Sequence, residues 1–176
     1  MNVEKLAKAV RNVPDFPIRG IQFKDVTTLF KDSYILQEIV EGLYEIYKDK
    51  GITKVVGIES RGFILGPLVA VRLNAGFIPI RKPGKLPAAV FEESYEKEYG
   101  TDAIQIHQDA ISSEDTILLH DDLLATGGTM QAAVRLIEKF NPQRIYVNFL
   151  IELTDLKGRE KFAPNIQLNS IIKYDI

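Results

Sequence analysis

The stretch TILLHDDLLATGGT, residues 116–129, carries the densest chemistry in the sequence. An apolar run ends in two adjacent acids, and a turn of small residues then leads into a helical pattern. Residues 126–129 would place unpaired N–H groups, threonine hydroxyls and a helix dipole around a phosphate dianion. Charge-assisted hydrogen bonds contribute roughly 1.5 to 3 kcal/mol each, so three or four outweigh the cost of removing water from one phosphate. The stretch therefore predicts a phosphate site.

The two acids, Asp121 and Asp122, need a different target. They lie too close to the loop for both to hold a phosphate-bound metal as in nucleoside triphosphatases, and the chain has no G-x-x-x-x-G-K-S/T loop. A ribose offers two vicinal hydroxyls and develops positive charge at C1 as its leaving group departs. The alternative is an acidic strand end before a glycine-rich helix start, without function. We favour the ribose because all parts occur together and in order.

Alternating strand and helix patterns must position these groups. Apolar runs indicate strands at 54–58, 77–81, 116–120 and 144–151, and helical spacing indicates helices at 1–13, 33–50, 63–74 and 130–140. Asp32 or Ser33 is suited to cap the second helix. Strands without polar alternation favour the α/β class, with a mainly parallel sheet flanked by helices on both faces. Ligands of such sheets bind beyond the carboxyl ends of the strands.

Two segments do not follow these patterns. Residues 14–20 contain two prolines and a glycine, which exclude a regular helix and indicate a shaped loop. Residues 91–100 are polar and contain four glutamates, so we expect them to bury little surface and to be mobile.

Composition limits the partners and the compartment. The 176 residues are 45% apolar, which suits one domain with one core. The formal charge of -2 argues against nucleic acid, and no apolar stretch has the roughly 20 residues of a membrane helix. Cysteine is absent, and the N-terminus shows no export signal. We therefore expect a cytoplasmic protein that binds neither nucleic acid nor membranes.

The stretch 116–129 resembles the phosphoribosyl-pyrophosphate motif of the type I phosphoribosyltransferases, in which an apolar strand, two acids and TGGT follow one another. Further segments resemble the adenine-specific members: DFPIRGIQFKDVT, ESRGF, RKPGKLP, YEKEYGTD and ELTDLKGREK. The resemblance implies the type I phosphoribosyltransferase fold as one domain over 1–176, with a small N-terminal hood (1–30) and a flexible catalytic loop. It also implies a purine-salvage reaction, in which adenine and phosphoribosyl pyrophosphate give AMP and pyrophosphate.

The resemblance assigns roles to individual residues. It implies four catalytic residues, Arg61, Glu98, Asp121 and Asp122, and a 5′-phosphate loop made of Ala125, Thr126, Gly127, Gly128 and Thr129. In the flexible loop, Glu98 is the candidate acid near the purine N7. Only the EYG match separates it from the other glutamates of that segment.

Pyrophosphate binding is implied for Ser60, Arg61, Lys82, Lys85 and Tyr99, with a cis peptide between Ser60 and Arg61. Arg61 suits a bidentate contact with phosphate, and its alternative is a surface arginine at a helix start. From the residues alone, Lys82 and Lys85 fit solvated lysines on a hairpin. With RKPGKLP matched, we favour pyrophosphate binding, and service of a neighbouring subunit's site is an open alternative for one of the two lysines.

Adenine binding is implied for main-chain groups of Gln22, Phe23 and Lys24, and for the side chains of Leu124 and Leu153 with Ala125. A 6-oxo purine would leave the main-chain groups unpaired and would be rejected. Ordinary core packing is the alternative for Leu124, Ala125 and Leu153. Lys24, Arg19 and His120 depart from the common pattern, and His107 and His120 lack metal-ligand spacing, so we expect both histidines to be structural or solvent-facing.

The resemblance further implies Mg²⁺ bound through the substrate near Asp121 and Asp122, without a metal site held by the protein alone, and a homodimer. One alternative function keeps the fold and changes the base to xanthine, hypoxanthine or guanine, which the hood and the ELTDLKGREK segment oppose. Another is a non-catalytic regulator that senses phosphoribosyl pyrophosphate. The catalytic loop and the absence of surplus positive charge oppose that function.

Overall fold

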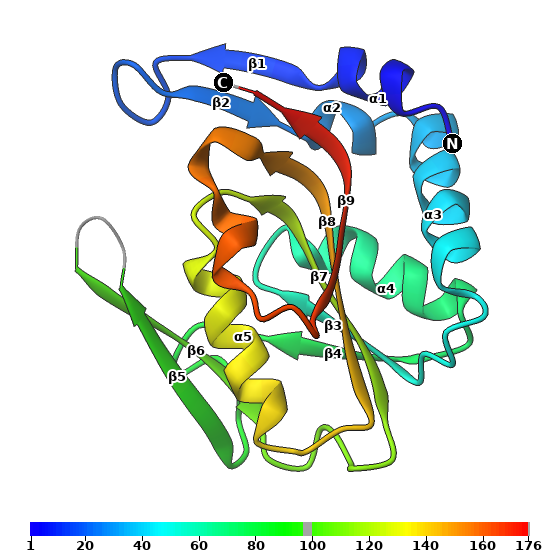
Figure 1. Cartoon of the computed structure of the whole chain (residues 1–176), viewed down its shortest axis with the longest axis vertical. Coiled ribbons are helices and arrows are strands. Elements are labelled where there is room, and N and C mark those ends of the chain that lie inside the picture. The colour runs from blue at the N-terminus through cyan, green and yellow to red at the C-terminus, as the bar shows by residue number, and fades with distance from the viewer. Residues whose placement is uncertain (97–99, 176) are drawn as a thin grey trace.

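A five-stranded sheet forms the centre of the computed structural model, which describes residues 1–96 and 100–175 (Figure 1). Its strand order is β4-β3-β7-β8-β9, and all neighbouring strands run parallel. The strands are β3 (Lys54–Ile58), β4 (Gly76–Ile80), β7 (Thr116–Leu124), β8 (Arg144–Leu153) and β9 (Gln167–Tyr174). The predicted α/β class with a parallel sheet is confirmed.

Helices cover both faces of this sheet, as Figure 1 shows. One hydrophobic cluster joins α3 (Ser33–Tyr47) and α4 (Gly62–Arg72) to the face that contains Leu118, and a second joins α5 (Gly128–Glu138) to the face that contains Ile117 and Leu119. Successive residues of β7 therefore enter opposite layers, as the pleat requires. Asp32 caps α3, because its carboxylate accepts hydrogen bonds from two N–H groups of the first turn at 2.9 and 3.1 Å.

The N-terminal region forms the predicted hood, with more strand than expected. Helix α1 (Val3–Ala9) ends early, and β1 (Arg11–Pro14) then pairs antiparallel with β2 (Gln22–Asp25) around the predicted loop. The short helix α2 (Thr27–Phe30) follows. The hood lies against the end of β9, where the Tyr174 hydroxyl donates to the Ala7 carbonyl at 2.7 Å.

The segment expected to bury little is instead part of a hairpin of β5 (Val90–Glu96) and β6 (Thr101–His107). Alternate residues of β5 face α5: the Phe91 ring packs on Phe140 with centroids 5.3 Å apart, Glu93 pairs with Arg135, and Tyr95 is buried. The expectation of little burial is wrong for residues 91–96, because outward glutamates hid a strand with a period of two. Residues 97–99, with Glu98 and Tyr99, lie outside the described residues.

Sequence patterns also missed the C-terminal part of the sheet. Two short 3₁₀ turns, η1 (Thr154–Leu156) and η2 (Gly158–Lys161), connect β8 to β9, which was not predicted. Strand β7 continues past His120 through both acids to Leu124. Among the described residues, no helix is both long and apolar enough to cross a membrane.

Candidate active site

Three adjacent strand ends bring the predicted site residues together. Strands β3, β7 and β8 are neighbours in the parallel sheet, so their carboxyl ends lie along one edge. The turn 59–61 follows β3, the acids lie near the end of β7, and Leu153 ends β8. The hood lies at the same end of the molecule (Figure 1).

The predicted 5′-phosphate loop, residues 125–129, surrounds a cavity of about 100 Å³ between β7 and the start of α5. Gly127 is the N-cap of α5 and has a φ of 82°, in the left-handed region that suits glycine. Its N–H and those of the first helical turn are groups that a helix cannot pair internally, and they attract an anion. The loop therefore offers the cavity backbone donors at the start of a helix.

The two acids lie together near the end of β7, and Oδ1 of Asp121 would lie 3.4 Å from a Cβ at Gly62. Asp121 lines the phosphate-loop cavity, whereas Asp122 is only 4% exposed and forms an ion pair with Arg61, with 2.6 Å between Oδ2 and Nε. This contact is an ion pair and not a directed hydrogen bond, because Oδ2 has no hydrogen-bond partner in the part of the chain that the structure describes. Both carboxylates thus lie between the two predicted anion regions, since Asp121 lines the cavity of residues 125–129 and also lies beside Gly62.

Burial makes these carboxylates hard to ionise together. Burial and the neighbouring Asp122 carboxylate raise the pKa of Asp121 well above its ordinary value. Burial also raises the pKa of Asp122, although the Arg61 guanidinium opposes the change. A positive charge arriving between them would favour ionisation of both, so the pair suits a cationic ligand or transition state.

Arg61 reaches Asp122 because α4 starts close to β7. A Cβ at Gly62 would lie 2.9 Å from the carbonyl oxygen of His120, so the residue there must be small. The cis peptide of this turn joins Glu59 to Ser60, one bond before the predicted position between Ser60 and Arg61. That prediction is wrong by one residue, because the resemblance located the turn but not its bond.

Acids already pair with most cations beside this turn. Glu59 holds Arg81 at 3.1 and 3.2 Å, and the Lys82 ammonium contacts Asp102 and the Tyr95 hydroxyl. Burial lowers the pKa of Lys82, but these two hydrogen bonds outweigh it and raise the pKa. Lys85 is exposed near the same loop. The pairing of Glu59 with Arg81 and of Asp102 with Lys82 was not predicted from the sequence, although Glu59, Arg81 and Asp102 all lie within matched segments.

The predicted base-binding residues lie on β2 and at two strand ends. Gln22, Phe23 and Lys24 are half-buried on β2, and the Arg61 guanidinium lies 5.4 Å from the centre of the Phe23 ring. The hood thus contacts the pyrophosphate turn directly. Leu124 and Leu153 are 1% and 8% exposed and belong to the two core clusters.

His120 is a buried residue that pairs with a neighbouring strand. His120 is 2% exposed, and its Nδ1 lies 2.9 Å from Oδ1 of Asn148 on β8. Burial lowers the pKa of His120 to about 4, so its ring is neutral at pH 7, and Nδ1 donates to the amide oxygen. Its expected structural role is confirmed. Within 1–96 and 100–175, no group of three or more acids or histidines could hold a metal ion.

Comparisons with known proteins identify the relatives of this chain. Residues 25–166 match the family described as the phosphoribosyl transferase domain. An adenine phosphoribosyltransferase of Bacteroides thetaiotaomicron is 64% identical over 172 residues, which cover 98% of each chain. One from Bacteroides fragilis is 67% identical over 174 residues, also 98% of each chain.

Solved structures agree with these relatives. The adenine phosphoribosyltransferase of Rhodothermus marinus has a TM-score of 0.92 at 48% identity and covers 98% of each chain. The enzyme of Giardia lamblia, complexed with 9-deazaadenine, has a TM-score of 0.94 at 42% identity and covers 100% of this chain and 99% of its own.

Proposed function

The chain belongs to the phosphoribosyltransferase family, among its adenine phosphoribosyltransferases, and from this premise we propose how its site joins adenine to phosphoribosyl pyrophosphate. The enzyme makes AMP and pyrophosphate. One observation carries the proposed mechanism: a backbone phosphate loop and an ion-paired arginine lie on either side of two adjacent carboxylates at neighbouring strand ends. This is the arrangement that a sugar with an anion at each end requires.

The carboxylates act on the ribose. Residues 125–129 hold the 5′-phosphate through backbone N–H groups and hydroxyls, which fixes the sugar over β7. The bond from C1 to the pyrophosphate oxygen breaks, and the bond from C1 to adenine N9 forms. Asp121 and Asp122 stabilise the positive charge on the ring between these two events. N9 attacks from the adenine tautomer that carries its ring proton on N7, and the Glu98 carboxylate shares and then accepts that proton as the purine becomes positively charged.

The leaving group is held on the other side of the acids. Arg61, Ser60, Lys82, Lys85 and Tyr99 form the proposed pyrophosphate site. Because Arg61 pairs with Asp122 and Lys82 contacts Asp102, pyrophosphate must share or exchange these partners. Such an exchange limits how tightly the product is held, since part of each new ion pair replaces an old one.

Selection of adenine rests on main-chain groups of residues 22–24. Strand β2 belongs to a two-stranded sheet and pairs with β1 along one edge. Its other edge has no strand partner among the described residues, so backbone groups there remain available. A carbonyl accepts from the 6-amino group and an N–H donates to N1, whereas a 6-oxo purine presents the reverse pattern.

Mg²⁺ enters with the substrate in this proposal. If bound there, the ion would neutralise part of the pyrophosphate charge and so make pyrophosphate a better leaving group. Asp121 and Asp122 offer the oxygen ligands that Mg²⁺ prefers, and their raised pKa values fit a place for a cation, so the residues fit the ion. Both acids then help to place ribose hydroxyls and metal together.

A second copy of the chain completes the proposed assembly. Ile64, Leu68 and Val71 lie on one face of α4 and are 37%, 41% and 82% exposed. Leu68 and Val71, together with residues of α3, border a groove of about 400 Å³. An apolar face of one helix suits a self-complementary two-fold contact, and in such a dimer one of the two lysines Lys82 and Lys85 would serve the neighbour's site. Sedimentation should give a dimer, and Val71→Glu should give a monomer.

Release of pyrophosphate tests the proposed function. The purified protein should release it from phosphoribosyl pyrophosphate and Mg²⁺ only when adenine is present, and excess chelator should stop the reaction. Equal rates with hypoxanthine or guanine would favour a 6-oxo purine enzyme instead. Tight binding of phosphoribosyl pyrophosphate without turnover would favour the sensing regulator. The cytoplasm, which supplies both substrates, is the proposed compartment.

A further inference from the structure

The segment between β8 and β9 packs its backbone against the phosphate loop. A Cβ at Gly158 would overlap the carbonyl oxygen of Ala125 and lie 3.0 Å from Leu124 Cδ1, and a Cβ at Gly127 would lie 2.9 Å from the carbonyl oxygen of Gly158. Interiors this dense transmit small displacements. A shift of Gly158 would therefore move the phosphate loop.

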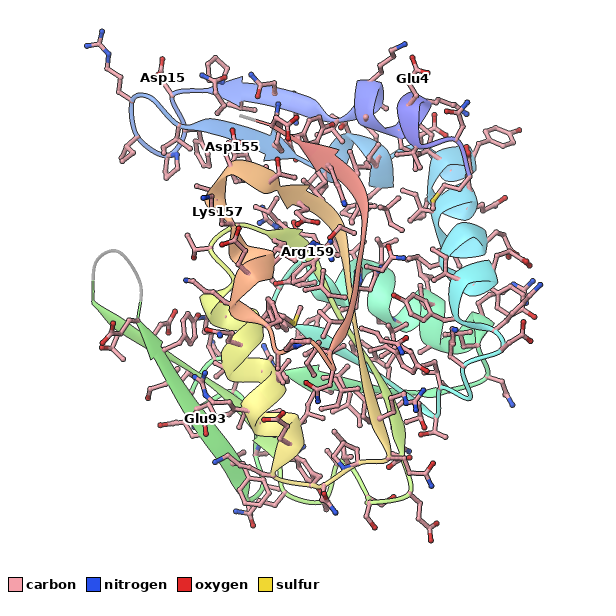
Figure 2. The ribbon with its side chains drawn as sticks, in the orientation of Figure 1. Glu4, Asp15, Glu93, Asp155, Lys157 and Arg159 are labelled. Atoms are coloured by element: carbon pink, nitrogen blue, oxygen red, sulfur yellow. The ribbon has the colours of Figure 1, made fainter. Side chains whose placement is uncertain are left out.

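Arg159, the next residue, fixes this segment to two strands. Its guanidinium donates to both carboxylate oxygens of Glu152 on β8 at 2.9 and 2.5 Å, and to the Leu168 carbonyl and Ser170 hydroxyl on the β9 side at 3.0 and 3.1 Å. Figure 2 labels Arg159 where the chain passes between the two strands. Four directed contacts in a planar fork define one position of the residue.

The partner of Arg159 belongs to the interior. Glu152 is 4% exposed, unlike the acids of ordinary surface pairs, so its charge needs a partner. The pair closes a loop over residues 153–158, with Leu153 at one end and Gly158 at the other. Gln131 of α5 adds a further connection by donating to the Lys161 carbonyl at 2.7 Å.

We propose that Arg159 and Glu152 are positioning residues for the 5′-phosphate: their ion pair holds Gly158 against the phosphate loop and so keeps the loop's N–H groups aimed at the anion. This inference rests on the proposed role of residues 125–129. No part of the pair touches the substrate. Its effect is transmitted through the backbone contact between Gly158 and residues 125–127.

A double variant separates positioning from stability. Arg159→Met alone leaves a buried carboxylate without its partner and destabilises the protein, whereas Glu152→Gln/Arg159→Met removes that lone charge. Calorimetric titration of the folded double variant, confirmed by circular dichroism, should show about tenfold weaker binding of ribose 5-phosphate, as expected when one charge-assisted hydrogen bond to phosphate is misdirected. Pyrophosphate, which uses the turn after β3, should bind as in the wild type.

Matched control variants show whether a change in affinity comes from the Glu152–Arg159 pair. Lys48→Met removes the exposed Lys48–Glu45 pair and should change neither affinity. Gly158→Ala should also weaken ribose 5-phosphate binding, and Gly76→Ala should not, because only the flexible Lys54 side chain opposes a Cβ there. Wild-type binding of ribose 5-phosphate by both Gly158→Ala and the folded double variant would overturn the inference. Equal weakening of pyrophosphate would also overturn it, since the pair would then act on the whole fold. If the wild type binds pyrophosphate but not ribose 5-phosphate, the proposed phosphate loop itself fails.

Discussion

The two proposed anion-binding regions of the site balance charge in different ways. The phosphate loop, residues 125–129, contains no charged side chain and depends on backbone shape, with Gly127 in the left-handed region. The pyrophosphate side depends on cations, and Arg61, Arg81 and Lys82 each pair with an acid in the structure. One region is ready for its ligand, whereas the other must exchange partners.

This difference separates affinity from turnover. A prearranged backbone gains binding energy without reorganisation, so it suits the phosphate that stays on the product AMP. Paired cations exchange one partner for another when a ligand binds. Such a site suits the leaving group, which must depart. Substitutions that alter shape should therefore harm the first region, and substitutions that remove acids should strengthen the second.

The largest expected effect is on turnover. Asp122→Asn removes a carboxylate beside the reacting ribose and also releases Arg61, so kcat should fall by about two orders of magnitude or more, whereas pyrophosphate binding should hold or improve. Rapid-quench measurement of a single turnover checks the chemical step. Asp121→Asn should lower kcat with a smaller gain in pyrophosphate binding, since the ion pair of Arg61 is with Asp122 and remains in that variant. Near-normal turnover in both variants would contradict the role of the acids.

His120, on the strand that joins the two regions, should make the folded protein less stable in acid. The pKa of His120 is about 4 in the folded protein and near 6.5 when unfolded, so only the unfolded chain gains the proton between these values. The neutral His120 ring therefore contributes fully to the free energy of unfolding above pH 6.5, and this contribution declines as the pH falls towards 4. At about pH 4.5 the loss should be about 2 kcal/mol relative to pH 7.

His120→Gln, which keeps a donor for Asn148 and does not titrate, isolates this effect. Urea unfolding at both pH values should show a smaller loss in the variant. Acids whose pKa values are lowered, such as Asp25 and Glu59, weaken both proteins equally in acid. Parallel pH curves for the wild type and the variant would refute the assignment.

The phosphate region could be predicted from the sequence far better than the pyrophosphate region, and the reason is physical. Residues 116–129 are contiguous, so strand, acids, loop and helix appear as one local pattern. The pairs Arg61–Asp122 and Lys82–Asp102 join residues far apart in the chain, and no local period reveals them. Strand β5 (Val90–Glu96) was missed because its buried residues alternate along the chain with exposed ones, two of them acids. The positions of Gly158 and Arg159 depend on β9, which lies beyond the last predicted strand.

A shape change in the phosphate loop gives the next effect. Gly127→Ala places a Cβ 2.9 Å from the Gly158 carbonyl oxygen at a φ of 82°, where the left-handed conformation alone costs a non-glycine residue about 1 to 2 kcal/mol. The KM for phosphoribosyl pyrophosphate should rise about tenfold, and pyrophosphate binding should be unchanged. Gly51→Ala is the matched control, since its φ of 66° is similar and nothing lies within 4 Å of a Cβ there. A similar KM in both variants would show that the close contact does not matter.

The smallest expected effect lies on the other side of the site. Asp102→Asn removes the carboxylate that contacts Lys82, so the ammonium no longer has to leave an ion pair when pyrophosphate binds. Because the pair is only partly buried, with 36% of the Lys82 side chain and 22% of the Asp102 side chain exposed, the gain should be below about 1 kcal/mol, or a few-fold in affinity. Tyr95 continues to orient the ammonium through its hydroxyl at 2.9 Å, so the lysine keeps its place.

Calorimetric titration with pyrophosphate should show tighter binding at low salt and a smaller difference at high salt, where the ion pair is screened in the wild type. Glu92→Gln, in the same hairpin, removes an acid that bonds Gln105 instead of a lysine and should leave the affinity unchanged. Weaker pyrophosphate binding by Asp102→Asn would mean that the acid holds Lys82 in place for the ligand, and the cations of this region would then be as prearranged as the backbone of the phosphate loop.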